Sequence, residues 1–327
     1  MSNAIIRQDG AAAVVADNLW EIRLGAVPFA AGLLAGVAGA VLVRRRAARA
    51  ARPKAPVPTG WPVNIAHRGG AAVVPENTLE GFREAVGLGD VTLELDVRTC
   101  AGGEVVVIHD PTVDRTTDGT GTVAHRGLPD LQRLDAGYRF AADGGSTHPW
   151  RGRGVRVPTL EEVYQQCPGR PVVIELKGDR PGTAEALWRT IEAAGAQDRT
   201  LVATNGTSVI RRFREASGGA VPTAASVGEF AVFWLLAHLR LHRAWDPPFQ
   251  ALQPPEVYRG VRVVTPHFVR RAHEAGLRVD VWTVDDEADM RRLLEWGVDG
   301  IMTDRPDVLA GVLNGGTGHD RAGGPQG

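Results

Sequence analysis

The chain has 327 residues, of which 43% are hydrophobic and 23% are charged, so it is long enough for one large globular domain or two small ones. Its formal net charge of −1 argues against a nucleic-acid-binding protein, which would carry a strong basic field. Its two cysteines, Cys100 and Cys167, can form neither a disulfide framework nor a zinc-ligand pattern.

The first part of the chain predicts a membrane anchor. Residues 24–43 contain no charged side chain, and a helix of this length, about 30 Å, matches the hydrocarbon core of a bilayer. Basic residues without an acidic one follow at 44–54, whereas 1–23 carry both signs, so the positive-inside rule places everything after the span in the cytoplasm. Two alternatives remain open, a buried Ala- and Gly-rich core helix and an exported domain that is anchored to the membrane.

The rest of the chain divides by composition. We expect an N-terminal tail at 1–23, the transmembrane helix at 24–43, a basic juxtamembrane segment and linker at 44–62, one domain at 63–313 and a disordered Gly-rich tail at 314–327.

Within the domain, short β-branched segments alternate with longer amphipathic ones. The predicted strands are Val63–Ala66, Val91–Val97, Val105–Ile108, Val172–Leu176, Thr200–Ala203, Ala220–Ala224, Phe249–Leu252, Arg278–Thr283 and Gly300–Met302. The predicted helices are Thr78–Val86, Leu160–Gln166, Thr183–Ala194, Ser208–Ala216, Pro266–Ala275 and Asp286–Trp296, with a capping box from Thr159 to Glu162 at the second. Roughly eight strands interleaved with helices predict an α/β fold of the closed (β/α)8 TIM type.

Two segments need separate comment. Val97 and Val105 are too close for a helical crossover, so these two strands form a hairpin or the barrel is irregular there. The apolar run Phe230–Leu241 is too short to span a bilayer, and it is either a barrel helix that faces the core or a helix that enters the membrane interface.

Ionisable side chains gather at the predicted strand ends, where barrel enzymes carry out catalysis. Glu94 and Asp96 share one face of the second strand, and Glu175 and Lys177 share one face of the fourth. Three inward carboxylates are costly to bury unless a cation relieves their charge, and oxygen ligands favour Mg²⁺ or Ca²⁺ over zinc. Glu94, Asp96 and Glu175 are therefore candidate ligands of one divalent metal ion. The alternative is a buried ion-pair network with Arg68 and Lys177.

Two histidines complete the predicted site. His67 follows the first strand and His109 the third, and imidazoles titrate near neutrality, so this pair can act as general acid and base. Arg68 and Lys177 lie at the same mouth and can bind phosphate oxygens. A metal ion, two cations and two histidines fit hydrolysis of a phosphate ester.

The motifs, taken in order, resemble those of the glycerophosphodiester phosphodiesterases. They are His67-Arg68-Gly69-Gly70, Pro75-Glu76-Asn77-Thr78, Glu94-Leu95-Asp96-Val97, Val106 to Asp110, Arg115 to Gly121, Leu134 to Gly137, Val157 to Glu162, Glu175-Leu176-Lys177, Val281 to Val284 and Gly300 to Pro306. The resemblance spans nearly all of Val63 to Leu309.

This resemblance implies a phospholipase-C-like barrel that hydrolyses glycerophosphodiesters to glycerol 3-phosphate and an alcohol. It implies that His67 and His109 are the acid–base pair, that Glu94, Asp96 and Glu175 bind the metal, and that Arg68 and Lys177 contact phosphate. It further implies that Glu76 supports the metal or orients His67, and that Trp282 forms a wall of the pocket against the glycerol moiety. At the end of the fifth strand the chain departs from the family pattern, with Ala203-Thr204-Asn205 in place of Ser-Phe, so no substrate contact is transferred there.

The sequence thus predicts a membrane-anchored, metal-dependent phosphodiesterase. Lysophospholipids, cleaved in a lysophospholipase-D-type reaction, are alternative substrates because the anchor places the enzyme beside lipid. An inactive membrane-tethered binding protein is the alternative outside enzymes. Lys177 is the only lysine of the domain, which is otherwise rich in arginine, so we expect its identity as well as its charge to matter.

Overall fold

The computed structural model describes residues 56–57, 60–61 and 63–315. The predicted membrane span at 24–43 lies outside these residues. Among the helices that the structure describes, none combines the length and the apolar character that a membrane crossing requires.

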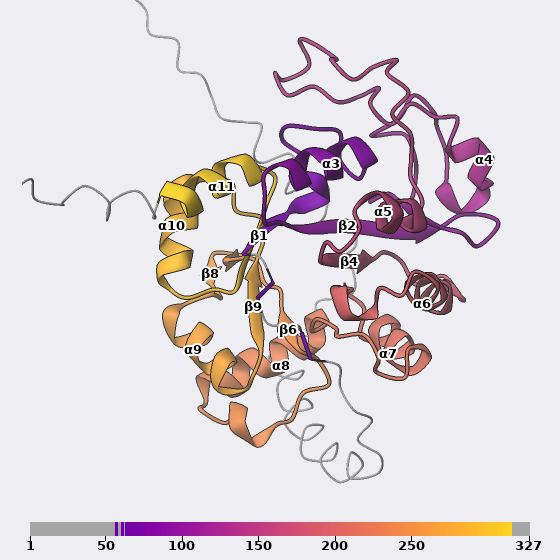
Figure 1. Ribbon diagram of the computed structural model, residues 1–327. Helices are drawn as coiled ribbons and strands as arrows, with labels where there is room; N and C mark the ends of the chain where they lie inside the picture. The colour runs from indigo at the N-terminus through magenta and orange to yellow at the C-terminus, as the bar shows by residue number, and fades with distance from the viewer. Residues whose placement is uncertain (1–55, 58–59, 62, 316–327) are drawn as a thin grey trace, which may run out of the picture. The chain divides into compact units, whose positions relative to one another are not determined.

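A curled parallel sheet forms the centre of the domain (Figure 1). Its strands follow the order β5-β4-β2-β1-β10-β9-β6. They are β1 (Asn64–Ala66), β2 (Thr92–Thr99), β4 (Val172–Leu176), β5 (Thr200–Ala203), β6 (Ala251–Leu252), β9 (Arg278–Val281) and β10 (Gly300–Thr303). Isolated parallel bridges from Val202 to Thr223 and from Ala224 to Ala251 connect β5 with β6. This arrangement fits the predicted TIM-type barrel, although the predicted strand at 220–224 is reduced to two bridging residues.

The strand β3 (Val105–Val107) pairs with β2 in the antiparallel direction, with Val97 opposite Val107. The hairpin interpretation is therefore confirmed. The chain then runs through an insertion that carries the short helix α4 (Leu128–Leu131) and packs a small core of its own around Ile108 and Leu131. This insertion begins beside His109 and so borders the predicted site.

Helices surround the strands (Figure 1). They are α3 (Leu79–Gly87), α5 (Leu160–Gln166), α6 (Thr183–Ala193), α7 (Thr207–Ala216), α8 (Val227–His238), α9 (Pro266–Glu274), α10 (Glu287–Glu295) and α11 (Pro306–Gly315). The predicted capping box is confirmed, since the Thr159 side chain accepts from the Glu162 backbone N–H and Glu162 accepts from that of Thr159. Short 3-10 helices occur at His67–Gly69, Val123–His125, Gln197–Arg199 and His242–Ala244, and a separate two-stranded hairpin joins β7 (Val257–Tyr258) to β8 (Val261–Arg262).

The predicted apolar segment 230–241 is mainly a core helix. Phe233 of α8 is fully buried and packs edge-on against Phe268 of α9, with ring centroids 6.1 Å apart. Leu239 and Leu241, beyond the end of the helix, are 53% and 51% exposed. The core-facing interpretation is therefore correct for the middle of this segment.

The alternation of side chains along each strand decides which of them face the interior of the curled sheet and which face the surrounding helices. Ile65, Val173, Leu201, Ala251 and Met302 come from different strands and form one buried cluster, which is the interior. The odd-numbered residues of β2 instead pack against the surrounding helices in the largest core cluster. The even-numbered acidic residues of β2 consequently face the interior.

Candidate active site

The turn after β1 places the first histidine. Gly69 and Gly70 adopt φ values of 87° and 102°, a region that favours glycine, and the Gly70 backbone N–H donates to the His67 carbonyl over 2.8 Å. A Cβ at Gly69 would lie only 3.1–3.2 Å from backbone atoms of Gly81 and Phe82 in α3, so a larger residue would require these atoms to shift. This tight turn holds His67 at the carboxyl end of β1.

The ring of His67 is held by a carboxylate from the other end of the chain. Its Nδ1 lies 2.6 Å from Oδ1 of Asp304, which follows β10. The Asp304 backbone N–H in turn donates to Oδ1 of Asp285 over 2.8 Å. Burial and Arg68 lower the pKa of His67. The hydrogen bond to Asp304 and the charge of Glu94 raise it by more than this, so the pKa of His67 lies above its ordinary value.

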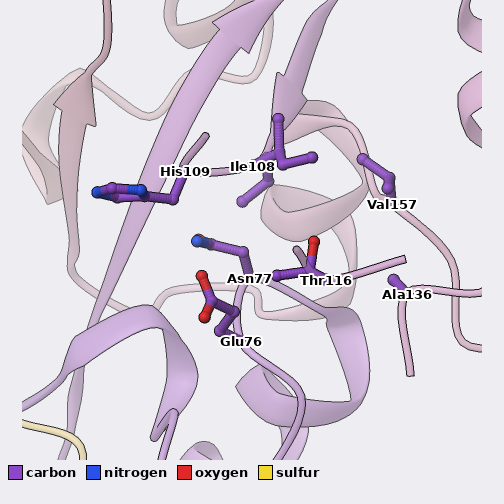
Figure 2. A pocket seen from close by; sticks show the side chains of 8 residues that line it. Glu76, Asn77, Ile108, His109, Thr116, Ala136 and Val157 are labelled. Carbon is purple, nitrogen blue, oxygen red and sulfur yellow. The ribbon is translucent and has the colours of Figure 1, made fainter. Parts of the chain in front are cut away.

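The second histidine is held in the same way. His109 Nδ1 lies 2.6 Å from Oδ1 of Asp110, and Arg98 donates from Nε to the His109 carbonyl over 2.8 Å. In both histidines the contact at Nδ1 leaves Nε2 as the ring nitrogen that can exchange a proton with a substrate. Figure 2 shows His109 at a small pocket; its lining residues are Glu76, Asn77, Val107, Ile108, His109, Thr116, Ala136 and Val157.

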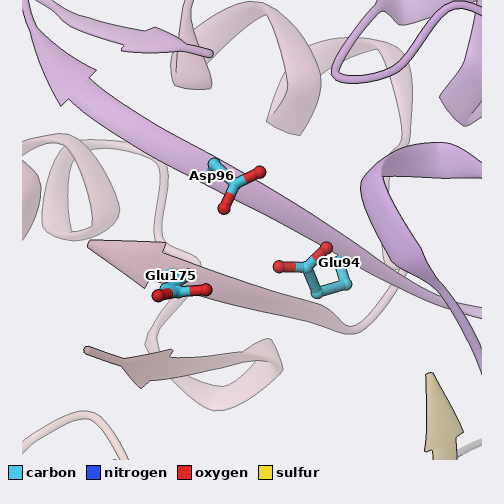
Figure 3. A group of neighbouring side chains, drawn as sticks. All are labelled: Glu94, Asp96 and Glu175. Carbon is cyan, nitrogen blue, oxygen red and sulfur yellow. The ribbon is translucent and has the colours of Figure 1, made fainter. Parts of the chain in front are cut away.

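Three acidic side chains lie close together on neighbouring strands (Figure 3). Glu94 and Asp96 project from β2, and Glu175 projects from β4, where Asp96 and Glu175 are direct partners in the strand register. Each offers a carboxylate oxygen, and these oxygens all lie within 4.8 Å of one another. The structure therefore brings together the three carboxylates that the sequence grouped.

Two cations lie against this acidic group. Lys177 Nζ is 2.9 Å from Oε1 of Glu175 and 3.3 Å from Oδ1 of Asp96, and Arg68 Nε is 3.2 Å from Oδ2 of Asp96. Burial by itself would raise the pKa of Asp96, but Lys177 and then Arg68 lower it well below its usual range. The contacts expected for a buried ion-pair network are thus present, and they compensate Asp96 and Glu175.

Glu94 is compensated less well, and this is the observation that fits a metal ion. Its Oε2 accepts from the Arg68 backbone N–H over 2.9 Å and lies 4.0 Å from Nε2 of His67. Burial, and then the neighbouring charge of Asp96, raise the pKa of Glu94 above its usual value. A donor set made only of carboxylate oxygens, in which the charge of Glu94 is poorly compensated, is suited to a hard divalent cation.

Glu76 occupies a different place from the one expected. It accepts from Arg68 NH1 over 3.0 Å and also binds Arg115, while Asp304 holds the ring of His67. The ring of His67 is thus held by Asp304, directly after β10, and no contact of Glu76 with this ring is found among the described residues. The alternative expectation, that Glu76 supports the metal, stays a prediction. Among the described residues, Arg68 connects Glu76 with the acidic group, because its Nε also lies 3.2 Å from Oδ2 of Asp96.

Trp282 follows β9 and lies at the same carboxyl edge. It is 39% exposed, and its indole Nε1 donates to the Gln253 carbonyl over 2.6 Å, which fixes the ring at the mouth. Asn205, from the segment where the sequence deviates from the family pattern, donates from Nδ2 to Oε1 of Glu175 over 3.3 Å. The structure therefore adds a polar contact to Glu175 at a position where the sequence analysis transferred none.

Sequence reasoning missed several supporting side chains. Asn77 binds Asp96 twice, through Nδ2 to Oδ2 over 2.9 Å and through its Oδ1 to the Asp96 backbone N–H over 3.1 Å. Asp304 could have been found by reading the residues after the last predicted strand, as was done for the other strand ends. Asn77 lies in the motif Pro75-Glu76-Asn77-Thr78, but its partner could not be read from the sequence, because this loop reaches β2 only in the folded chain.

The fold is a TIM-type α/β fold, and acidic and histidine side chains lie at the carboxyl edge of its sheet. This combination is typical of hydrolytic enzymes that act on phosphate esters. Comparison with known proteins agrees. Residues 67–308 match the Glycerophosphoryl diester phosphodiesterase family. A glycerophosphodiester phosphodiesterase of Caldanaerobacter subterraneus subsp. tengcongensis is 32% identical over 254 residues, which cover 76% of this chain and 96% of the relative.

Two further comparisons extend this result. A lysophospholipase D of Mus musculus is 25% identical over 282 residues, covering 77% of this chain and 86% of the relative. The solved structure of an Oleispira antarctica phosphodiesterase in complex with the product sn-glycerol-3-phosphate aligns with a TM-score of 0.62 and 25% identity, covering 78% of this chain and 97% of that one. The chain belongs to the glycerophosphodiester phosphodiesterase family.

Proposed function

We propose that this protein hydrolyses glycerophosphodiesters to glycerol 3-phosphate and an alcohol, with the help of one divalent metal ion, Mg²⁺ or Ca²⁺. The observation that carries this proposal is the group formed by Glu94, Asp96 and Glu175 beside two histidines held by carboxylates. The names of its relatives and the product complex of the Oleispira enzyme support the same reaction.

Glu94, Asp96 and Glu175 would hold the metal ion. When bound, such an ion stabilises negative charge on the phosphate oxygens. Arg68 supplies a guanidinium fork and Lys177 a compact ammonium at the same mouth, and both attract the phosphate group. These two side chains orient the diester and offset the charge that develops during the reaction.

His67 and His109 move the protons. One histidine accepts the proton of the attacking hydroxyl at Nε2, as that oxygen forms a bond to phosphorus. The other donates a proton to the alcohol oxygen as its bond to phosphorus breaks, so the two rings exchange protonation states in this step. Opening of a cyclic phosphate with the roles reversed, or proton exchange with solvent after direct attack by water, restores the initial states. The attacking group is water or the vicinal hydroxyl of the substrate; the second route yields a cyclic phosphate that water opens afterwards. Asp304 and Asp110 keep each Nδ1 protonated and the rings oriented.

Lysophospholipids are a second substrate class. The murine lysophospholipase D among the relatives supports this alternative, and the exposed indole of Trp282 gives the mouth an apolar wall. The same phosphate-to-alcohol bond is cleaved, so the same groups serve both reactions.

The proposal includes a membrane anchor. In it, residues 24–43 span the bilayer and the basic residues of 44–54 keep the following domain in the cytoplasm. A reporter fused to the C-terminus of the full chain should therefore be found on the cytoplasmic side. Its detection outside the cytoplasm would favour the exported alternative.

Product analysis tests the function. The full chain is incubated with glycerophosphocholine or with lysophosphatidylcholine, with excess chelator or with added Mg²⁺ or Ca²⁺. We expect glycerol 3-phosphate and choline from the first substrate, formed only when metal is present. Lysophosphatidic acid and choline from the second substrate would favour the alternative, and turnover of neither would indicate the inactive binding protein.

A matched pair of variants locates the activity. Glu94→Gln should abolish the metal-dependent reaction, whereas Glu104→Gln, at the exposed turn between β2 and β3, should retain it. Full activity of Glu94→Gln, or of the native chain in excess chelator, would contradict the metal site.

A further inference from the structure

Arg115 joins two carboxylates that come from different parts of the chain. Its NH1 and NH2 donate to Oε2 and Oε1 of Glu76 over 2.6 and 2.8 Å. Its Nε donates to Oδ2 of Asp110 over 2.6 Å, and NH2 also reaches Oδ1 of Asp110 over 3.3 Å. One planar guanidinium thus bridges the loop before α3 and the loop after β3.

Each of these carboxylates holds a group of the proposed reaction. Asp110 binds Nδ1 of His109 over 2.6 Å, and Glu76 accepts from Arg68 NH1 over 3.0 Å. A continuous series of charge-assisted hydrogen bonds therefore runs from the ring of His109 through Arg115 to the guanidinium of Arg68. Such bonds are stronger and more directional than those between neutral groups.

The chemistry of the junction explains why an arginine lies there. Burial would raise the pKa of Glu76, but Arg68 and then Arg115 lower it to about 2, so this carboxylate is ionised at neutral pH. Two ionised carboxylates at one junction repel each other unless a cation lies between them. An ammonium group could neutralise this charge, but it lacks the planar fork that binds both carboxylates in fixed positions.

We propose that Arg115 is a positioning residue that fixes the ring of His109 and the guanidinium of Arg68 relative to each other. This inference rests on the proposed function, since it concerns the geometry of that reaction. Among the described residues, the hydrogen bonds of the Arg115 side chain go to Glu76 and Asp110 and to none of the proposed metal ligands. Its removal should therefore lower turnover and leave the metal ligands in place. Positioning groups of this kind commonly contribute about 10- to 100-fold in activity.

The first measurement is the turnover of glycerophosphocholine by Arg115→Ala. We expect kcat to fall about 10- to 100-fold while the concentration of metal ion required for half-maximal activity stays near that of the native chain. Asp110→Asn should produce a similar loss, and the double variant should lose little more than either single one, because both changes break the same series of contacts.

Chemical rescue distinguishes a positioning role from a general loss of stability, because an added cation would not restore the activity of a destabilised variant. The Arg115 side chain is 41% exposed, so a small cation from solvent can reach the space that the substitution leaves. Millimolar guanidinium should restore part of the kcat of Arg115→Ala, whereas ammonium at equal ionic strength should restore less. Should the alanine variant fail to fold, Arg115→Lys replaces it and should still lose about tenfold.

Arg139→Ala is the matched control. Arg139 lies in the same insertion and donates from Nε to the Thr117 carbonyl over 3.2 Å, so it supports the loop without a contact to Glu76 or Asp110 among the described residues. Its kcat should stay within about twofold of the native value, and guanidinium should leave it unchanged.

The outcomes separate this inference from the proposed function. If the native chain is active, His109→Ala is inactive and Arg115→Ala is fully active, the role of Arg115 is overturned and the proposed function stands. Equal losses in Arg115→Ala and Arg139→Ala, or a loss that guanidinium does not restore, would also overturn it. A native chain without activity would instead contradict the proposed function.

Discussion

The contact between His67 and Asp304 allows a quantitative prediction. Asp304→Asn keeps the size of the side chain and the backbone N–H bond to Asp285, but it replaces a carboxylate with a neutral amide. Hydrogen bonds to charged groups contribute about 1.5–3 kcal/mol and those between neutral groups about 0.5–1.5 kcal/mol, so the protonated ring loses about 1–2 kcal/mol. This difference corresponds to a loss of about 5- to 30-fold in kcat.

The pH dependence follows from the same contact. Asp304 raises the pKa of His67, in opposition to burial and Arg68, so its removal should lower that pKa. If His67 acts as the base, the acidic limb of the kcat profile moves to lower pH; if it acts as the acid, the alkaline limb moves in the same direction. A loss greater than 30-fold would indicate that the amide N–H faces Nδ1 and forces the other ring tautomer.

The assay is the pH profile of kcat with glycerophosphocholine at saturating metal. Asp307→Asn is the control, because Asp307 binds Arg305 and leaves the Asp304 contact with His67 intact. Its profile should match that of the native chain. Native-like kcat and an unshifted profile in Asp304→Asn would refute the argument that this carboxylate tunes His67.

Three further substitutions have expected outcomes. His109→Ala should lower kcat by about 10²–10⁴, the usual contribution of a general acid or base, and near-normal turnover would exclude that role. Lys177→Arg should impair turnover although it keeps the charge, because the Lys177 side chain is only 9% exposed and its compact ammonium contacts both Glu175 and Asp96, which a bulkier planar guanidinium would have to displace. Unimpaired kinetics would make the single lysine of the domain a coincidence. Gly300→Ala should destabilise the fold by about 1–3 kcal/mol or more in thermal or urea unfolding, since its Cβ would collide with the buried Asp280 carboxylate; an unchanged midpoint would show that the interior can adjust.

Much of the site could be predicted because its determinants are local. Glu94 and Asp96 had to share a face, since side chains of a strand alternate with a period of two, and the apolar residues between them indicated which face packs against helices. Glu175 and Lys177 followed the same rule on β4. The hairpin of β2 and β3 was one of two readings, and the short connection between Val97 and Val105 already excluded a crossover helix.

The partners of these residues were decided by the tertiary structure. Asp304 is 237 positions from His67, and the two meet because β1 pairs with β10, with Ala66 opposite Thr303. Arg115 reaches Glu76 because the insertion folds back over the loop before α3. A predicted closed barrel places the first strand beside the last, but sequence spacing does not give the register that brings Asp304 to His67, nor the path of the insertion that brings Arg115 to Glu76.

The sequence by itself thus determined the class of the fold, the family motifs and the acidic, basic and histidine groups at the strand ends. The tertiary structure decided that Asp304 and not Glu76 holds His67, that Asn77 supports Asp96, and that Arg115 links Asp110 with Glu76. The physical reason is that strand periodicity fixes where a side chain points, whereas a hydrogen bond over 2.6 Å requires two distant segments to be placed together.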